Sequence, residues 1–123
     1  METVIEKEMK IGIMSREEFR NRTLAIARGE YKPGKDEPKI WFESVQSFAQ
    51  VLSDDNRSLL RVIEEKKPKS LVELEILTGR KKSNLSRTLH KMADYGIVEL
   101  VKRTKEVAPI VKANCFNLKV CAY

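Results

Sequence analysis

The sequence has few of the residues on which disulfide-rich, metal-binding and membrane proteins depend. Two cysteines and one histidine among 123 residues indicate neither a disulfide framework nor a metal site. No apolar run approaches the roughly 18 residues of a membrane span, and the acidic start METVIEKEMK is unlike a signal peptide. The sequence therefore predicts a cytoplasmic protein, in which Cys115 and Cys121 are unreactive thiols or, alternatively, a redox pair.

Catalytic motifs are also missing. The chain has no glycine-rich phosphate loop, no cluster of metal ligands and no paired nucleophile and base. The single histidine, His90, has no partner residues in its vicinity and is interpreted as a surface side chain. We therefore expect a protein that is not an enzyme and that uses no cofactor and no metal.

Positive charge is concentrated in the C-terminal half. Residues 1–38 carry 8 basic and 8 acidic side chains, and residues 39–65 carry 3 basic and 5 acidic ones. Residues 66–123 carry 13 basic and 5 acidic side chains, which accounts for the whole formal net charge of +6. Such a distribution is typical of a module that binds a polyanion, although a lysine-rich solvated surface would produce the same count.

The N-terminal pattern predicts a strand followed by a helix. Apolar residues alternate from Val4 to Met14, which indicates a strand whose partner lies far along the chain or in another chain. Ser15 and Glu18 form a capping box for a helix that ends near Gly29. A loop with proline and glycine follows over residues 31–38. Residues 1–38 are thus expected to form a strand–helix arm that serves dimerisation or partner binding.

Residues 39–123 are predicted to form a winged helix-turn-helix domain. Helical spacing begins at Ile40 and runs to Leu52, with Trp41 in its core stripe or at an interface. Further helices are expected from Ser53 to the residue before Pro68, and over residues 70–78 and 83–95. Strands are expected over residues 97–102, 107–113 and 116–120. The predicted fold class is α+β, mainly helical with a small β-wing.

The third helix of this motif has two chemically distinct faces. Leu85, Leu89 and Met92 fall on one side of a helical projection and form the side that packs on the preceding helices. The opposite side carries polar and basic residues, and residues 79–91 contain five basic side chains and no acidic one. This face has the hydrogen-bond donors and the charge for a DNA major groove, where Arg87 suits guanine and Asn84 suits adenine.

The expected DNA contacts fall in three groups. The turn and the recognition helix supply base and phosphate contacts, and Ser70, at the start of the preceding helix, supplies another contact. The basic wing lies along the DNA backbone or the minor groove. In the alternative, this surface does not bind DNA: residues 80–82 form a solvated turn, and Arg87 pairs with an acidic residue on a neighbouring helix. The candidate DNA-binding residues are Ser70, Arg80, Lys81, Lys82, Ser83, Asn84, Ser86, Arg87, Lys91, Lys102, Arg103 and Lys105.

Three stretches of the sequence resemble a known family. PKIWFES at 38–44, GRKKSNLSRTL at 79–89 and YGIVEL at 95–100 are similar to a MarR-like winged-helix family of small prokaryotic regulators, which includes TumA-type antitoxins of type II toxin–antitoxin modules. The resemblance implies a homodimer that binds operator DNA, represses its own operon and neutralises a toxin. This chain departs from the pattern at Glu75, which is expected close to the turn, where it would weaken or tilt DNA docking.

The arm over residues 1–38 leaves a second function open. A lone strand invites pairing with the sheet edge of another protein, so the chain could act chiefly as an inhibitor of a toxin by protein–protein contact. The same arm could instead exchange between two subunits of a homodimer. RNA is a weaker third candidate, because no aromatic stacking platform accompanies the basic patch.

Overall fold

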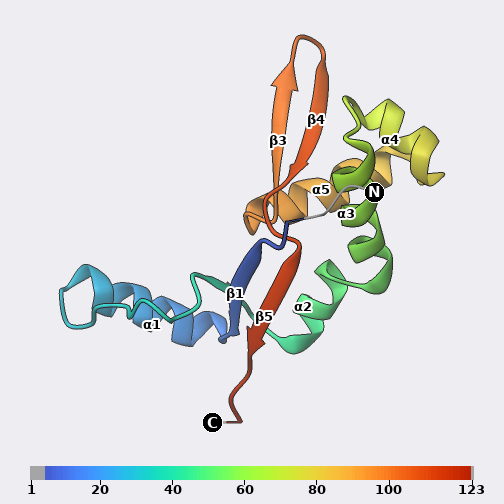
Figure 1. Cartoon of the computed structure of the whole chain (residues 1–123). Coiled ribbons are helices and arrows are strands. Elements are labelled where there is room, and N and C mark those ends of the chain that lie inside the picture. Colours follow the sequence, from blue (N-terminus) through green and yellow to red (C-terminus); the bar gives the residue numbers. More distant parts are fainter. Residues whose placement is uncertain (1–4, 123) are drawn as a thin grey trace. The chain divides into compact units, whose positions relative to one another are not determined.

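The computed structural model describes residues 5–122, and this part of the chain is an α+β protein with five helices and five strands (Figure 1). It divides into two compact units, one made of residues 5–8 and 51–115 and the other of residues 9–50 and 116–122. None of the described helices combines the length and the apolar character needed to cross a membrane. Val4, where the predicted first strand begins, lies outside the described residues.

The unit of residues 9–50 and 116–122 is built on a three-stranded sheet. Strand β1 (Glu8–Ile13) lies between β2 (Ile40–Phe42) and β5 (Cys115–Lys119). β1 and β2 are parallel, with Ile11 opposite Ile40 and Ile13 opposite Phe42. The expectation of partners far along the chain is therefore confirmed. The expectation of an unpaired strand is wrong, because both edges of β1 are hydrogen-bonded within the chain.

The predicted helix from Ile40 to Leu52 is wrong in its first turn. Residues Ile40–Phe42 form strand β2, and helix α2 extends only over Val45–Val51. The pairing of β2 with β1 overrides the helical spacing, because it buries Phe42 completely. Phe42 packs edge-to-face on Phe48, with ring centroids 5.5 Å apart. Val45, which follows Trp41 at helical spacing and would share the core stripe of the predicted helix, is instead 48% exposed.

Trp41 is held between the backbone of Gly12 and the side chain of Arg22. A Cβ atom at Gly12 would lie only 2.2 Å from Cζ3 of Trp41, so only glycine leaves room for the indole ring. On the other side, Cζ of Arg22 lies 5.1 Å from the Trp41 ring centroid and 5.7 Å from that of Tyr31. Glu37 accepts hydrogen bonds from both Arg22, at 3.0 Å, and the hydroxyl of Tyr31. This stack fastens helix α1 and the loop after it to Trp41 of the sheet.

Helix α1 (Arg16–Ala27) follows the sequence prediction closely. Ser15 caps it by accepting a hydrogen bond from the backbone N–H of Glu18 at 3.2 Å, and the chain turns at Gly29 with φ of 74°. None of its residues is buried, and Phe19 and Leu24 are each more than 40% exposed. The helix therefore depends on its cap and on the Arg22 stack rather than on a packed apolar face.

The unit of residues 5–8 and 51–115 contains three helices and a hairpin. The helices are α3 (Asp54–Lys66), α4 (Leu71–Thr78) and α5 (Lys82–Asp94), and the hairpin consists of β3 (Val98–Arg103) and β4 (Glu106–Val111). Aliphatic side chains from all of these elements are buried together. The buried residues of these elements are Leu59, Leu60, Ile63, Leu74, Leu85, Leu89, Met92, Val98, Ala108, Pro109 and Val111.

Helix boundaries in this unit are set by local signals that the sequence displays. Ser53 and Ser70 cap α3 and α4 by accepting hydrogen bonds from the third backbone N–H after each of them, at 3.2 and 3.1 Å. Lys67 ends α3 in a left-handed conformation directly before Pro68. Gly79 ends α4 with φ of 74°, where its N–H reaches the carbonyl of Glu75 at 2.8 Å. Only three residues then separate α4 from α5.

The hairpin pairs in regular antiparallel register, from Val98 opposite Val111 to Arg103 opposite Glu106. Thr104 and Lys105 form its tip, and Thr104 adopts a φ of 54°. In Figure 1 the hairpin projects away from α5, toward the top of the view. The two strands predicted over residues 97–102 and 107–113 are thus confirmed, with small shifts at their ends.

Asn114 anchors the N-terminal segment beside the hairpin. Its side-chain oxygen accepts from the backbone N–H of Lys7 at 2.7 Å, and its amide nitrogen donates to Glu64 at 2.8 Å and to the carbonyl of Ile5 at 2.9 Å. The ammonium group of Lys7 donates to the carbonyl of Val111 at 3.0 Å. Residues 5–8 are therefore part of this unit rather than of a separate arm.

Candidate functional site

Helix α5 has the two faces that the sequence predicts. Leu85, Leu89 and Met92 are fully buried. The side chains on the opposite face are exposed, and they include the predicted Ser83, Asn84, Arg87, His90 and Lys91 and, in the last turn, Asp94. Because the apolar face is closed against the core, the polar face is rigidly presented to solvent.

Arg87 lies near the centre of the polar face. It is exposed, and no hydrogen bond or ion pair joins its guanidinium group to any residue in the described range 5–122. The alternative in which Arg87 pairs with a neighbouring acid is therefore excluded for this part of the chain. Its five N–H donors are available to an acceptor outside the protein.

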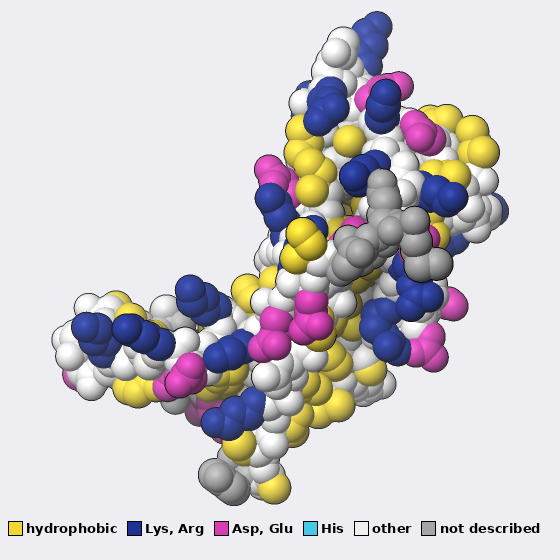
Figure 2. Space-filling view, viewed as in Figure 1, with side chains coloured by type: hydrophobic (Ala, Val, Ile, Leu, Met, Phe, Trp, Pro, Cys, Tyr) yellow, Lys and Arg dark blue, Asp and Glu magenta, His cyan; other side chains and the backbone are white. Residues whose placement is uncertain are grey.

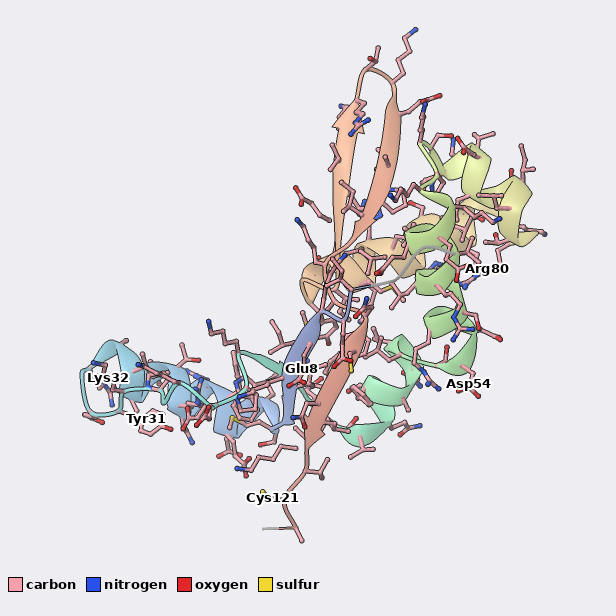
Figure 3. The ribbon with its side chains drawn as sticks, in the orientation of Figure 1. Glu8, Tyr31, Lys32, Asp54, Arg80 and Cys121 are labelled. Carbon is pink, nitrogen blue, oxygen red and sulfur yellow. The ribbon has the colours of Figure 1, made fainter. Side chains whose placement is uncertain are left out.

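Arg80 is engaged within the chain. It lies in the turn before α5 and is labelled in Figure 3. Its guanidinium group reaches three acceptors on two helices. Nε donates to Oδ1 of Asn84 at 2.9 Å, Nη1 to Oδ1 of Asn56 at 3.2 Å, and Nη2 to Oγ1 of Thr88 at 3.1 Å. Arg80 thus ties the first two turns of α5 to the start of α3, instead of projecting its donors into solvent.

A hollow of about 650 Å³ opens beside this arginine. Residues from the start of α3, the end of α4 and the start of α5 line it, among them Asn56, Leu77 and Asn84. The partners of Arg80 in α3 and in the second turn of α5, Asn56 and Thr88, were not found by sequence reasoning. Asn56 lies 24 residues before Arg80, and no local pattern connects the two.

The first residues of α5 differ in how they are used. Lys81, Lys82 and Ser83 have exposed side chains. The backbone N–H of Lys82, however, donates to Oε2 of Glu75 at 2.8 Å. The expectation that Glu75 lies close to the turn is confirmed, and its carboxylate takes one of the helix N-terminal donors that an external anion would use.

Other predicted site residues are partly committed to local structure. The hydroxyl of Ser70 accepts the capping hydrogen bond of α4. Ser86 is half-buried, and its carbonyl lies 2.7 Å from Nδ1 of His90. Lys91 is exposed on the second half of α5. Unlike the two serines, Lys91 has no hydrogen-bond or ion-pair partner for its side chain in the described range.

The hairpin carries the remaining predicted residues. Lys102, Arg103 and Lys105 are all exposed near its tip, and Figure 2 shows Lys and Arg side chains along the hairpin. No ion pair involves these three residues in the described range, whereas Lys112, at the base, pairs with Glu99 at 3.0 Å. The positive charge therefore increases toward the tip.

The two cysteines lie at the start of strand β5 and just after its end. Cys115 is half-buried in β5 and Cys121 is exposed beyond it, and neither belongs to a disulfide in the described part of the chain. Both are thiols, as expected, and the choice between unreactive thiols and a redox pair stays a prediction.

The comparison with protein families gives one match. A family model described as HVO_A0114 matches residues 51–118, more than half of the chain. The chain belongs to the HVO_A0114 family. The matched range contains α3, α4, α5 and the hairpin, and with them every predicted DNA-contacting residue. The comparisons with curated proteins and with solved structures found no match.

Proposed function

We propose that this member of the HVO_A0114 family is a sequence-specific, double-stranded DNA-binding transcriptional repressor. In this proposal α3–α5 and the hairpin form a winged helix-turn-helix, α5 is the recognition helix, and β3–β4 is the wing. The observation that carries the proposal is the polar face of α5. From Lys82 to Lys91 it bears donors and positive charge without an acidic side chain, and it is backed by three fully buried residues; the exposed Asp94 lies on the same face in the last turn.

The side chains divide into base-reading and backbone-binding groups. Arg87 is unpaired within residues 5–122 and projects from the middle of α5, so it is assigned to O6 and N7 of a guanine. Lys81, Lys82 and Ser83 are assigned to phosphates at the start of the helix, and the basic wing to the backbone or minor groove. A single module of this size buries too little surface for tight specific binding, so we propose a homodimer on two half-sites.

The resemblance of the sequence to MarR-like regulators adds a cellular role to the proposal. On that basis the protein is a cytoplasmic, autoregulating antitoxin of a type II module, and the neighbouring gene encodes its toxin. DNA binding does not depend on this extension, since it is argued from the exposed side chains of α5 and the hairpin.

A second function is favoured by the exposed side chains of helix α1. Phe19 and Leu24 lie in a helix that buries none of its residues, which suits contact with another protein. In this alternative the chain is chiefly an inhibitor of a toxin, and DNA binding is secondary. Its original basis, pairing through a lone N-terminal strand, no longer holds because β1 is the middle strand of the sheet.

Fluorescence anisotropy with two labelled duplexes tests the leading proposal. One duplex carries the DNA directly upstream of the protein's own gene, and the other a scrambled sequence of the same composition. We expect a preference of about 10³-fold or more for the upstream duplex near physiological salt. Equal affinities that fall steeply with salt would reduce the basic surface to general phosphate attraction and would contradict sequence-specific repression.

Two variants separate the functions, and a third serves as a control. Arg87→Ala removes a charge from the polar face of α5, and Arg61→Ala removes the same charge from an exposed position on α3. Only the first should reduce the preference for the upstream duplex. Phe19→Ala, assayed by co-purification with the product of the adjacent gene, should weaken that complex only if the alternative function is correct.

A further inference from the structure

Arg80 controls which hydrogen-bonding group Asn84 presents to solvent. Arginine has donors and no acceptor, so the atom of Asn84 that faces Nε of Arg80 at 2.9 Å must be the oxygen. The amide group of Asn84 is planar, and its Nδ2 therefore points away from Arg80. No described residue accepts a hydrogen bond from this nitrogen, and the side chain is exposed. Asn84 thus offers two N–H donors outward and keeps its acceptor turned toward the protein.

The orientation is fixed by more than one contact. Arg80 is itself held by Oδ1 of Asn56 and Oγ1 of Thr88, on α3 and α5. Asn56 is anchored in turn, because its Nδ2 donates to the carbonyl of Val51 at 3.0 Å. An Arg80 that swung away to release the oxygen of Asn84 would leave several acceptors without their donor.

We propose that Arg80 is a specificity-determining positioning residue, which makes Asn84 select a base with a keto oxygen. This inference rests on the proposed function. An unconstrained asparagine recognises adenine by accepting from N6 and donating to N7 at once. Because its oxygen accepts from Arg80 and faces the protein, Asn84 presents its two N–H donors outward, so it favours O6 of guanine or O4 of thymine. Adenine and cytosine present an amino group there, which opposes the outward amide nitrogen.

Asn84 lies near the start of α5, where its hydrogen-bonding groups can reach base edges. It is the third residue of α5, and the N-terminal residues of a recognition helix are those that contact base edges. Arg80 then contributes to recognition without touching DNA itself. In this proposal Arg80 is a positioning residue where the sequence suggests a direct contact, and a keto base replaces adenine as the expected partner of Asn84.

Selection from a library of duplexes with randomised base pairs, followed by sequencing, tests the inference on the full chain. The native protein should prefer guanine or thymine at one position of each half-site by about fivefold, the value of one net hydrogen bond. Asn84→Ala should abolish the preference at that position and leave the others unchanged. Asn84→Asp keeps an oxygen toward Arg80 and presents a second one outward, so the preference should invert to adenine or cytosine.

Controls distinguish positioning from contact. Asn21→Asp introduces the same charge on exposed helix α1 and should leave every base preference unchanged. Arg80→Met should release the amide and raise adenine at the Asn84 position, and this effect should vanish in Arg80→Met/Asn84→Ala. If the circular dichroism spectrum shows that Arg80→Met is unfolded, Asn84→Asp alone tests whether Arg80 positions Asn84.

The outcomes separate this inference from the function on which it rests. A native protein that selects no sequence overturns sequence-specific repression and the role of Arg80 together. A native protein that selects an operator, while Asn84→Asp retains the keto preference, overturns only the role of Arg80. A third outcome is a base preference that Arg80→Met loses and Asn84→Ala keeps. It would make Arg80 a direct DNA contact and would equally overturn the positioning role.

Discussion

Replacing Gly12 with alanine should strongly destabilise the unit that contains the three-stranded sheet. The added Cβ would lie 2.2 Å from Cζ3 and 2.5 Å from Cε3 of Trp41, whereas carbon atoms normally approach to about 3.5–4.0 Å. The indole ring must therefore move by more than about 1 Å. It has no free direction opposite Gly12, because Arg22 covers its other face and is itself held by Glu37.

The expected cost follows from this confinement. Overpacking by a single methyl group usually costs about 1–3 kcal/mol and sometimes more. The backbone of β1 cannot yield easily either, because it pairs with β2 at Gly12 itself. We expect the upper end of that range, about 3 kcal/mol, in the free energy of unfolding measured by urea titration and far-UV circular dichroism.

A matched substitution gives the control. Gly34→Ala makes the same chemical change where the nearest heavy atom, Cγ of Glu37, is 3.8 Å away and the backbone is not left-handed. It should leave stability unchanged or raise it by up to about 1 kcal/mol. In a Trp41→Ala background the cost of Gly12→Ala should almost disappear. A Gly12→Ala protein as stable as the native one would refute the proposed confinement of the ring.

Four further substitutions test the core and the DNA-binding proposal. Arg87→Ala should cost about 1–3 kcal/mol at one operator base pair in competition anisotropy, and equal binding of all four base pairs there by the native protein would contradict the assignment. Lys102→Ala should weaken binding to operator and scrambled duplexes alike and reduce the salt slope by about one; a loss limited to operator DNA argues against a backbone contact. Leu89→Ala, at a fully buried position of α5, should lower the free energy of unfolding by about 2–5 kcal/mol in urea, and a smaller loss would mean that the core is loosely packed. Glu75→Gln should tighten binding to scrambled DNA by roughly two- to fivefold, because it removes a negative charge beside the start of α5; Glu73→Gln on the same helix is the comparison, and an equal effect there would assign the gain to net charge alone.

The sequence predicts best those elements whose signals are local. Ser15, Ser53 and Ser70 each cap a helix where the pattern indicates one, and Gly79 ends α4 as expected. The division of α5 into a buried and an exposed face also follows from helical spacing alone. These predictions succeed because capping and amphipathic packing depend on residues within about one or two turns.

Strand β2 could not be predicted in the same way. Trp41 lies four residues before Val45, a spacing typical of a helix, and nothing nearby contradicts it. The deciding contacts are with β1, where Gly12 lies opposite Trp41 and leaves space for its ring. Such pairing is a property of the fold and not of the local sequence, which is why tertiary structure can override local periodicity.

The same distinction separates the two arginines of the candidate site. Arg80 and Arg87 lie seven residues apart in one basic stretch, and the sequence treats them alike. Arg80 meets acceptors on α3 and α5 and is used internally, whereas Arg87 projects into solvent without a partner in the described chain. Glu75 similarly takes a backbone donor at the start of α5. A count of basic residues therefore overstates the donors that α5 can offer to DNA. In the proposed function, base recognition is therefore assigned to Arg87 and the outward amide of Asn84, and phosphate binding mainly to the lysines at the start of α5 and on the hairpin.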